Sequence, residues 1–357
     1  MPSIKAGASG NDLTNTMRDS GKRVSRFSYI RVIACMAIVL LHTMNGARIY
    51  HMDTVSQGES LAAFTVCSVL MWAVPCFLMV SGALLLDPAR EITWGKIFGK
   101  YIRRMLIALI LFTAIFTVIR HDPKAGTSTV SEFFNGLAFN HCMAYLWYLY
   151  LMITVYLLLP LLRKAAFAMS DKGLWLLSGA LIAIAILLQF YLMGSVEGSP
   201  AFIGIIASLQ LLIGCLAYVF IGRLIFMKRL DSRICIALLV ITTVALAVAT
   251  YKAGQTTDDP SHISAYCSPL VVLQSISIYS LLLGIKAEAG PLIRSADKCT
   301  FGIYLIHMIF VRITMSELGV DPFSYGPFGF IFLSAIFFLA AYAVAWTIRN
   351  FTGSAII

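Results

Sequence analysis

Three ionisable residues lie within long apolar runs of the sequence. Arg31 and His42 are eleven residues apart in the first such run, and His307 lies in a later one. Eleven residues of α-helix return to nearly the same face with a rise of about 16 Å, so Arg31 and His42 share one side of a predicted helix. Ionisable groups that a membrane buries are candidates for function, because burying them is costly. The structural alternative is an arginine that reaches lipid phosphate and a histidine that bonds to a neighbouring helix.

Further polar groups surround His307. Thr300, Tyr304, His307 and Thr314 recur at spacings that place them on one helical face. An imidazole has an unperturbed pKa of about 6.5, so it can take up and release a proton near neutral pH. Taken alone, however, a buried histidine beside a phenol is more often structural than catalytic. His141, which precedes another apolar run, is ambiguous.

Basic residues lead into the third apolar run. Lys100, Arg103 and Arg104 stand at positions i, i+3 and i+4, which share one face of a helix. Three cations on one face bind phosphate groups well, and arginine can do so with two parallel hydrogen bonds. The alternative is the ordinary enrichment of basic residues beside membrane spans on the cytoplasmic side.

An aromatic cluster opens the fourth run. Trp147, Tyr150 and Thr154 share one helical face there. Aromatic faces with hydroxyl groups suit the stacking of a sugar, which makes Trp147 and Tyr150 candidates for binding a substrate. The alternative is an aromatic belt at the membrane interface, which needs no binding function.

The composition indicates the class of protein that holds these residues. Of the 357 residues, 59% are hydrophobic and 12% are charged, whereas soluble domains have about 25% charged residues. This composition excludes a soluble enzyme, a disordered protein and a nucleic-acid-binding domain. The eight cysteines are scattered singly, without the spacing of a zinc site or a disulfide framework. We therefore expect neither a metal nor a nucleic-acid partner.

The apolar runs predict an all-α polytopic membrane protein with about ten transmembrane helices, since a helix of about 20 residues crosses the bilayer core. The third and ninth helices are predicted to be short. The predicted spans are Phe27–Asn45, Ala62–Leu86, Met105–Ile119, Tyr145–Leu162, Leu174–Met193, Ala201–Ile221, Ile234–Tyr251, Pro269–Ile285, Thr300–Met315 and Phe328–Ile348.

The distribution of basic residues predicts the orientation. With a cytoplasmic N-terminus, the great majority of the 27 lysines and arginines fall in alternate loops, as the positive-inside rule requires. Both termini are then cytoplasmic. We expect residues 1–26 to form a disordered cytoplasmic tail, residues 27–349 a single ten-helix membrane domain, and residues 350–357 a short cytoplasmic tail.

Four short stretches resemble the integral membrane acyltransferase-3 family, in order and in location. The run from Arg31 to His42 is similar to its Arg-x10-His signature, and Val74–Leu86 resembles its Val-Pro-x-Phe-Phe-x-x-Ser-Gly segment. Leu146–Leu149 resembles the Leu-Trp-Tyr/Phe-Leu element, and Phe301–His307 resembles the Ser-x-Gly-Ile-Tyr-Leu-x-His element. Each motif alone is weak, but together the four extend the resemblance over roughly residues 27 to 348.

Single positions near these motifs either agree with the family pattern or differ from it. Lys100-x-x-Arg103 stands where many members have Arg-x-x-Arg. Thr300 replaces the usual serine, which is conservative. A histidine often precedes the Leu-Trp pair, but Ala144 and Tyr145 occupy those positions here, which puts a role for His141 in doubt.

The resemblance implies transfer of an acyl group, usually acetyl, from cytosolic acyl-coenzyme A to a hydroxyl of an extracytoplasmic carbohydrate or related envelope molecule. His42 would be a general base or a transient acyl carrier. Arg31 would orient it indirectly or hold part of the donor, and His307 would assist proton transfer or stabilise an oxyanion. We expect a multi-pass protein of the bacterial cytoplasmic membrane.

The phosphates of acetyl-CoA would then suit the basic face formed by Lys100, Arg103 and Arg104. A proton-coupled transporter of a small anionic solute is the main alternative, since it too would bury histidines and an arginine. The sequence shows no internal repeat and no matched pair of broken helices, which are typical of such transporters. A non-catalytic sensor on the same fold is a third possibility, against which the intact Arg31 and His42 argue.

Overall fold

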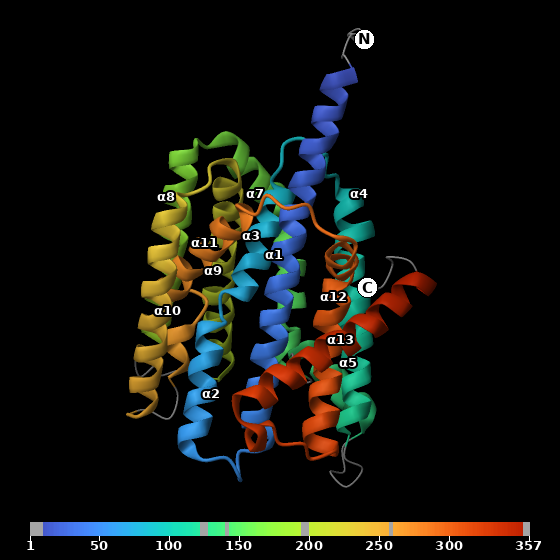
Figure 1. Cartoon of the computed structure of the whole chain (residues 1–357), viewed down its shortest axis with the longest axis vertical. Helices are drawn as coiled ribbons and strands as arrows, with labels where there is room; N and C mark the ends of the chain where they lie inside the picture. Colours follow the sequence, from blue (N-terminus) through green and yellow to red (C-terminus); the bar gives the residue numbers. More distant parts are fainter. Residues whose placement is uncertain (1–9, 122–127, 140–142, 194–199, 257–259, 353–357) are drawn as a thin grey trace.

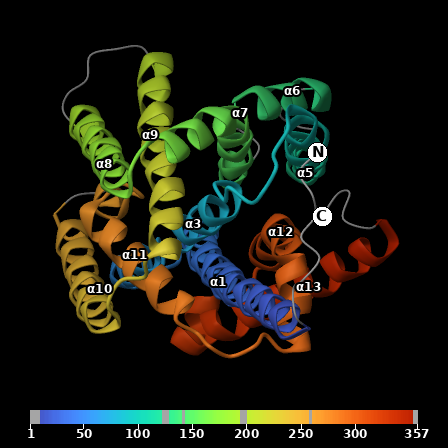
Figure 2. The ribbon, with the colours of Figure 1, turned by 90° about the horizontal axis from the view of Figure 1, so that it is seen from above.

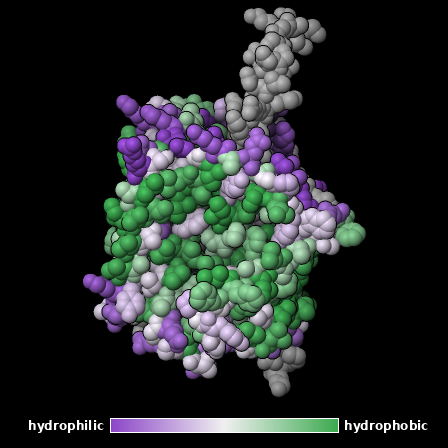
Figure 3. All heavy atoms as spheres, in the orientation of Figure 1, coloured by the Kyte–Doolittle hydropathy of each residue, from purple (hydrophilic) through white to green (hydrophobic). Residues whose placement is uncertain are grey.

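The computed structural model describes residues 10–121, 128–139, 143–193, 200–256 and 260–352, with side chains from residue 25 onward except those of 200 and 201. All regular structure within these ranges is helical. Ten of the helical segments are long and apolar enough to cross a membrane. Figure 3 shows an apolar band across the face in view, with hydrophilic residues gathered mainly at its two ends. The predicted all-α, ten-span fold is confirmed.

The helices follow one another with short connections (Figure 1). They are α1 (Gly10–Tyr50), α2 (Gln57–Val69), α3 (Ala73–Leu85), α4 (Trp94–Lys96), α5 (Arg103–Arg120), α6 (Thr129–Phe139), α7 (Trp147–Ala168), α8 (Asp171–Met193), α9 (Pro200–Met227), α10 (Ser232–Gly254), α11 (Pro269–Leu283), α12 (Pro291–Arg312) and α13 (Gly326–Thr352). A π-helix, Ile97–Ile102, joins α4 to α5, and another, Ile313–Glu317, continues α12. Short 3₁₀ turns cover Ala144–Leu146, Ser261–Ser264 and Pro322–Tyr325.

The third and ninth spans are longer than the sequence predicts. They are Trp94–Arg120 and Pro291–Glu317, each of 27 residues. Their first turns carry several charged residues, so an apolar run alone places their beginnings too late. At the other end of the sequence, α1 begins at Gly10, inside the segment expected to be a tail. The side chains before residue 25, and the ambiguous His141, lie outside the described residues.

The start of the first membrane span within α1, the beginning of α12 and the end of α13 meet at one end of the bundle. Arg31 pairs with Asp297, and Arg349 donates a hydrogen bond to the Lys298 carbonyl at 3.1 Å. This arrangement is the one expected for an even number of spans. We refer to it as the basic end, because it carries Arg31, Arg90, Lys100, Arg103, Arg163, Arg223, Lys298 and Arg349.

The second span is broken, in contrast to the single helix that the sequence predicts. α2 ends at Val69 and α3 begins at Ala73. Pro75 has no backbone N–H to bond to the carbonyl four residues earlier, at Met71, and its ring crowds that carbonyl. The N–H groups of Leu70 and Met71 bond three residues back instead of four. Figure 1 shows α3 inclined to α2, which turns α3 toward the centre of the bundle.

α1 and α12 form a parallel pair. The contacts join Arg31 to Asp297, Cys35 to Thr300 and His42 to His307. Partners along the pair are 265 or 266 positions apart, so the two helices run in register. Farther along, a Cβ atom added at Gly46 would lie 2.7 Å from Cγ1 of Val311, and the absence of a side chain keeps the helices close.

Two glycines bring α3 against α9. A Cβ atom at Gly82 would collide with the carbonyl oxygen of Val219, and one at Gly222 would collide with that of Met79. The hydroxyl of Tyr279, from α11, lies 3.3 Å from the carbonyl oxygens of both Met79 and Gly222. Close helix contact through small residues is the usual way that membrane helices associate.

Arg163 and Arg223 hold the end of α3 at the basic end. The last carbonyls of a helix have no partner within the helix. Arg163 donates to the carbonyls of Leu85, Asp87 and Arg90 at 2.5, 3.1 and 2.7 Å, and Arg223 donates to that of Leu86. Both guanidinium groups also lie over the ring of Phe167, at 4.8 and 5.2 Å. These two basic residues therefore have a structural role.

Candidate active site

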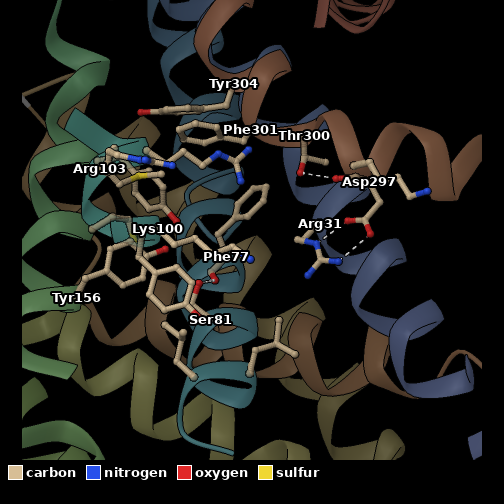
Figure 4. Close-up of a pocket in the computed structure, with 18 of the residues that line it drawn as sticks. Arg31, Phe77, Ser81, Lys100, Arg103, Tyr156, Asp297, Thr300, Phe301 and Tyr304 are labelled. Carbon is tan, nitrogen blue, oxygen red and sulfur yellow. Dashed lines mark hydrogen bonds and ion pairs between the residues drawn. The ribbon is translucent and has the colours of Figure 1, made fainter. Parts of the chain in front are cut away.

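A cavity of about 890 Å³ extends from the basic end into the bundle (Figure 4). Its walls come from α1, α3, α5, α7, α12, α13 and the π-helix before α5. Aromatic and aliphatic side chains such as Phe77, Tyr148 and Met152 line it farther in. Its charged lining residues are Arg31, Arg90, Lys100, Arg103, Arg104, Asp297, Lys298 and Arg349. This surplus of positive charge would attract an anionic ligand.

The three basic residues predicted to bind a donor all line this cavity. Lys100 lies in the π-helix and Arg103 begins α5, so the shared face is not that of one regular α-helix. The side chains of Lys100 and Arg103 are exposed. Arg104 is half-buried, with its guanidinium carbon 4.6 Å from the centre of the Phe301 ring. Of these three, Lys100 and Arg103 are therefore the more accessible to a ligand.

Arg31 does not stand alone as the sequence suggests. Its Nε and Nη2 donate to Oδ1 and Oδ2 of Asp297 at 2.5 and 2.7 Å. The hydroxyl of Ser28 donates to Oδ2 of the same carboxylate at 2.7 Å. Arg31 and Asp297 both line the cavity, and Figure 4 shows them across it from Lys100 and Arg103.

The two predicted histidines lie side by side. The ring centres of His42 and His307 are 5.2 Å apart, and the rings are tilted by 40°. His307 is fully buried, whereas His42 is half-buried. His42 forms no hydrogen bond within the described part of the chain. The pair thus brings together two groups that can move a proton, from helices far apart in sequence.

The protonation of His307 follows from its hydrogen bond. Its Nδ1 lies 3.1 Å from the carbonyl oxygen of Ile303, one turn earlier in α12. Because a carbonyl can only accept, Nδ1 carries the hydrogen. In the neutral ring Nε2 then has a free lone pair, and this atom is buried without a hydrogen-bond partner among the described residues. His307 is therefore arranged to accept a proton through Nε2.

Tyrosines pack around the two imidazoles. The ring of Tyr145 lies 6.1 Å from that of His42 and 5.8 Å from that of His307, and the Tyr304 ring lies 6.1 Å from that of His307. The Tyr145 hydroxyl donates to the carbonyl of Leu305 at 2.8 Å, and the Tyr304 hydroxyl donates to that of Tyr145. These bonds fasten the 3₁₀ turn before α7 to α12 beside the histidines.

The cavity leads toward the histidine pair. Ile38 and Tyr304 line it, and they precede His42 and His307 by four and three residues on the same helices. Three or four residues of α-helix correspond to a rise of about 5–6 Å. The inner part of the basic cavity therefore lies about one helical turn from the two imidazoles.

Comparison with protein families gives one match. The model of the acyltransferase-3 family, described as an acyltransferase domain, matches residues 24–350. The chain belongs to the acyltransferase-3 family. No curated protein and no solved structure is significantly similar to it. The family resemblance inferred from the four motifs is thus confirmed, and this member of the acyltransferase-3 family is a multi-pass membrane acyltransferase.

Trp147 and Tyr150 lie apart from the cavity of this acyltransferase. The Trp147 ring packs on that of Tyr266 with 5.3 Å between centres. The Tyr150 hydroxyl donates to the carbonyl of Leu137 at 2.6 Å. This bond ties α7 to α6, which lies across the end of α5 rather than along the bundle (Figure 2). Both residues stand at the end of the acyltransferase opposite the basic end, and neither lines the cavity.

Several residues of the acyltransferase site are absent from the sequence-based prediction. Asp297 and Ser28 complete the Arg31 cluster, and Tyr148 lines the cavity. A signal for Asp297 exists, because it lies one turn before Thr300 on the face that carries Tyr304 and His307. No comparable signal marks Ser28, whose role depends on how α1 packs against α12.

Proposed function

We propose that the protein transfers an acyl group, most often acetyl, from cytosolic acyl-CoA to a hydroxyl of an extracytoplasmic carbohydrate or envelope molecule. The observation that carries this proposal is the cavity that begins among basic residues and ends one helical turn from His42 and His307. A donor that is anionic at one end and reactive at the other matches such a cavity.

The donor would bind with its phosphates toward the basic end. Lys100 and Arg103 are exposed within the cavity, and phosphate contacts from such residues are charge-assisted. Arg31 lies about 16 Å from His42 along α1, by the rise of eleven helical residues. The pantetheine arm contains two amide units and short alkyl links, so its length is comparable to four or five extended residues, about 14–18 Å. An arm of this length spans the distance between a phosphate near Arg31 and a thioester near His42.

The chemistry needs a base for the acceptor hydroxyl. In the reaction that we propose, the acceptor oxygen attacks the thioester carbonyl carbon while His42 takes the hydroxyl proton. Collapse of the tetrahedral intermediate breaks the carbon–sulfur bond, and the coenzyme A thiolate takes the proton that His42 accepted, which returns His42 to its neutral form. The arrangement of His307 supports proton acceptance, because its neutral ring presents a lone pair at Nε2. It does not favour donation from Nε2 to an oxyanion.

The acceptor would approach from the end opposite the basic end. His42 lies in the outer half of α1 in this orientation, beyond the inner part of the cavity. The aromatic residues at that end include Trp147, Tyr150 and Tyr266. Since Tyr150 already donates to Leu137, we assign stacking of a sugar to Trp147 in preference to Tyr150.

The concentration of lysine and arginine supports a cytoplasmic location for the basic end. The donor is then taken from the cytosol and the acceptor from the opposite side of the membrane, which we propose is the bacterial cytoplasmic membrane. The transporter alternative is not favoured, because the chain belongs to an acyltransferase family.

A vesicle assay tests the proposed function. Inside-out membrane vesicles that contain the protein are supplied with acetyl-CoA labelled in the acetyl group, and label is followed into envelope carbohydrate. We expect transfer that depends on acetyl-CoA and is absent from vesicles with His42→Ala. Uptake of a solute without coenzyme A, and without label transfer, would instead identify a transporter.

A further inference from the structure

A carboxylate lies within the basic cavity. Asp297 is the acidic residue among its charged lining residues, although a negative charge weakens the attraction of the site for anions. The carboxylate accepts three hydrogen bonds within 2.7 Å, two from Arg31 and one from Ser28. Its side chain is only 10% exposed. The burial and the three hydrogen bonds distinguish this ion pair from an exposed one on the protein surface.

The pairing leaves one edge of Arg31 available. Nε and Nη2 are used by Asp297, whereas Nη1 has no hydrogen bond among the described residues. The side chain is 23% exposed and lines the cavity. A carboxylate that binds a guanidinium group through two parallel bonds fixes the plane of that group. Arg31 thus presents a fixed pair of N–H groups, without the loss of side-chain freedom that binding normally costs.

The opposite wall holds cations of a different kind. Lys100 and Arg103 are exposed and form no ion pair within the described ranges. Figure 4 shows the two walls facing one another across the cavity. A phosphate group between them would meet exposed cations on one side and an oriented guanidinium on the other.

We propose that Asp297 is a positioning residue, which orients Nη1 of Arg31 toward a phosphate of bound acyl-CoA. The inference rests on the proposed function, since it takes acyl-CoA as the donor. Asp297 raises donor affinity by fixing Arg31. The opposite arrangement, in which the phosphate must displace Asp297 from Arg31, would make the carboxylate lower that affinity.

The two arrangements predict opposite effects of Asp297→Asn. We expect KM for acetyl-CoA to rise about tenfold, which corresponds to about 1.4 kcal/mol, with a smaller change in kcat. Ser28→Ala, which removes one hydrogen bond from Oδ2, should raise KM less. Glu288→Gln is the matched control, because it removes an exposed acidic charge at the same end of the bundle and its contact to Tyr29 uses the backbone carbonyl. We expect this control to leave KM unchanged.

A phosphate-free donor separates positioning from general damage. With S-acetylpantetheine, the kcat/KM of Asp297→Asn should equal that of the unaltered protein. A fall in KM for acetyl-CoA, an equal loss with both donors, or an effect no larger than that of Glu288→Gln would overturn the proposal. If Asp297→Asn does not insert into the membrane, the same comparison with Ser28→Ala decides the matter.

Failure of the proposed function would be recognised separately. Coenzyme A binding to the purified protein, measured without turnover, should weaken in Asp297→Asn and not in Glu288→Gln. An unaltered protein that binds coenzyme A but transfers no acetyl group would contradict the proposed reaction and leave the Asp297 assignment standing. Unchanged binding in Asp297→Asn would contradict the assignment alone.

Discussion

The imidazole rings of His42 and His307 lie 5.2 Å apart, on two parallel helices whose contacting residues are 265 or 266 positions apart in sequence. The same register pairs Arg31 with Asp297 at the basic end. One helix pair thus positions both the residues proposed to hold the anionic end of the donor and the histidines at its reactive end. The separation of these two ends follows from the rise of α1.

Replacement of His307 separates proton transfer from packing. His307→Asn retains an N–H that can donate to the Ile303 carbonyl, but it lacks the lone pair at Nε2. We expect membrane insertion to be normal and the rate of acyl transfer to fall by about 10²–10⁴, the range for loss of general acid–base catalysis. Activity near that of the unaltered protein would show that His307 has only a structural role. The measurement is kcat, with thermal unfolding as the test of folding.

The cations opposite Arg31 should govern donor affinity. Arg103→Ala should raise KM for acetyl-CoA by the equivalent of about 1.5–3 kcal/mol, the range for a hydrogen bond to a charged group, and Lys100→Ala together with Arg103→Ala should raise it further. The KM for the acceptor should change little. Lys228→Ala provides the control, because Lys228 is exposed outside the cavity. Equal KM values for acetyl-CoA in all three variants would show that Lys100 and Arg103 do not bind the donor and only flank a membrane span.

The contact of α3 with α9 should be intolerant of any side chain. Gly222→Ala places a Cβ atom against the backbone of Met79, where no flexible side chain can move aside. We expect a loss of about 1–3 kcal/mol in stability, as for other overpacked positions, seen as a lower Tm. Gly179→Ala in α8 is the control, because nothing lies within 4 Å of its added Cβ. A Tm for Gly222→Ala equal to that of the control would contradict the close contact.

Reporter fusions test the orientation of the bundle. Fusions at both termini, and labelling of single cysteines near Lys100, should report the cytoplasmic side. The physical reason is the excess of lysine and arginine at this end. A terminus on the outer side would reverse the assignment of the donor and acceptor sides.

The number and order of the membrane spans could be predicted from the sequence, because apolar runs report directly on burial in lipid. The location of Arg31 and His42 on one side of a helix could also be predicted, since it depends on helical periodicity alone. Lys100, Arg103 and Arg104 could be grouped for the same reason, and all three line the cavity.

Features that depend on pairing between helices could not be predicted in this way. The contact of Arg31 with Asp297 needs the parallel packing of α1 on α12, which no local pattern reveals. The structural role of Arg163 depends on where the end of α3 lies, which the sequence does not give. Because many basic residues gather at this end of the bundle, the sequence does not distinguish Arg163 from the others. The break between α2 and α3 has a local signal, which is Pro75 itself. The run from Gln57 to Leu85 is nevertheless continuously apolar, so hydropathy alone predicts a single helix there.

The most direct test of the central claim is acyl transfer by His42 variants. Purified protein in membranes is supplied with acetyl-CoA and acceptor, and product formation is compared for the unaltered protein, His42→Ala and His42→Gln. The account predicts that both variants fold and bind coenzyme A but lose about 10²–10⁴ in rate, because glutamine can hydrogen-bond but cannot exchange a proton near neutral pH. Activity of His42→Gln near that of the unaltered protein would contradict the account, because His42 would then be a structural hydrogen-bonding residue and not the base.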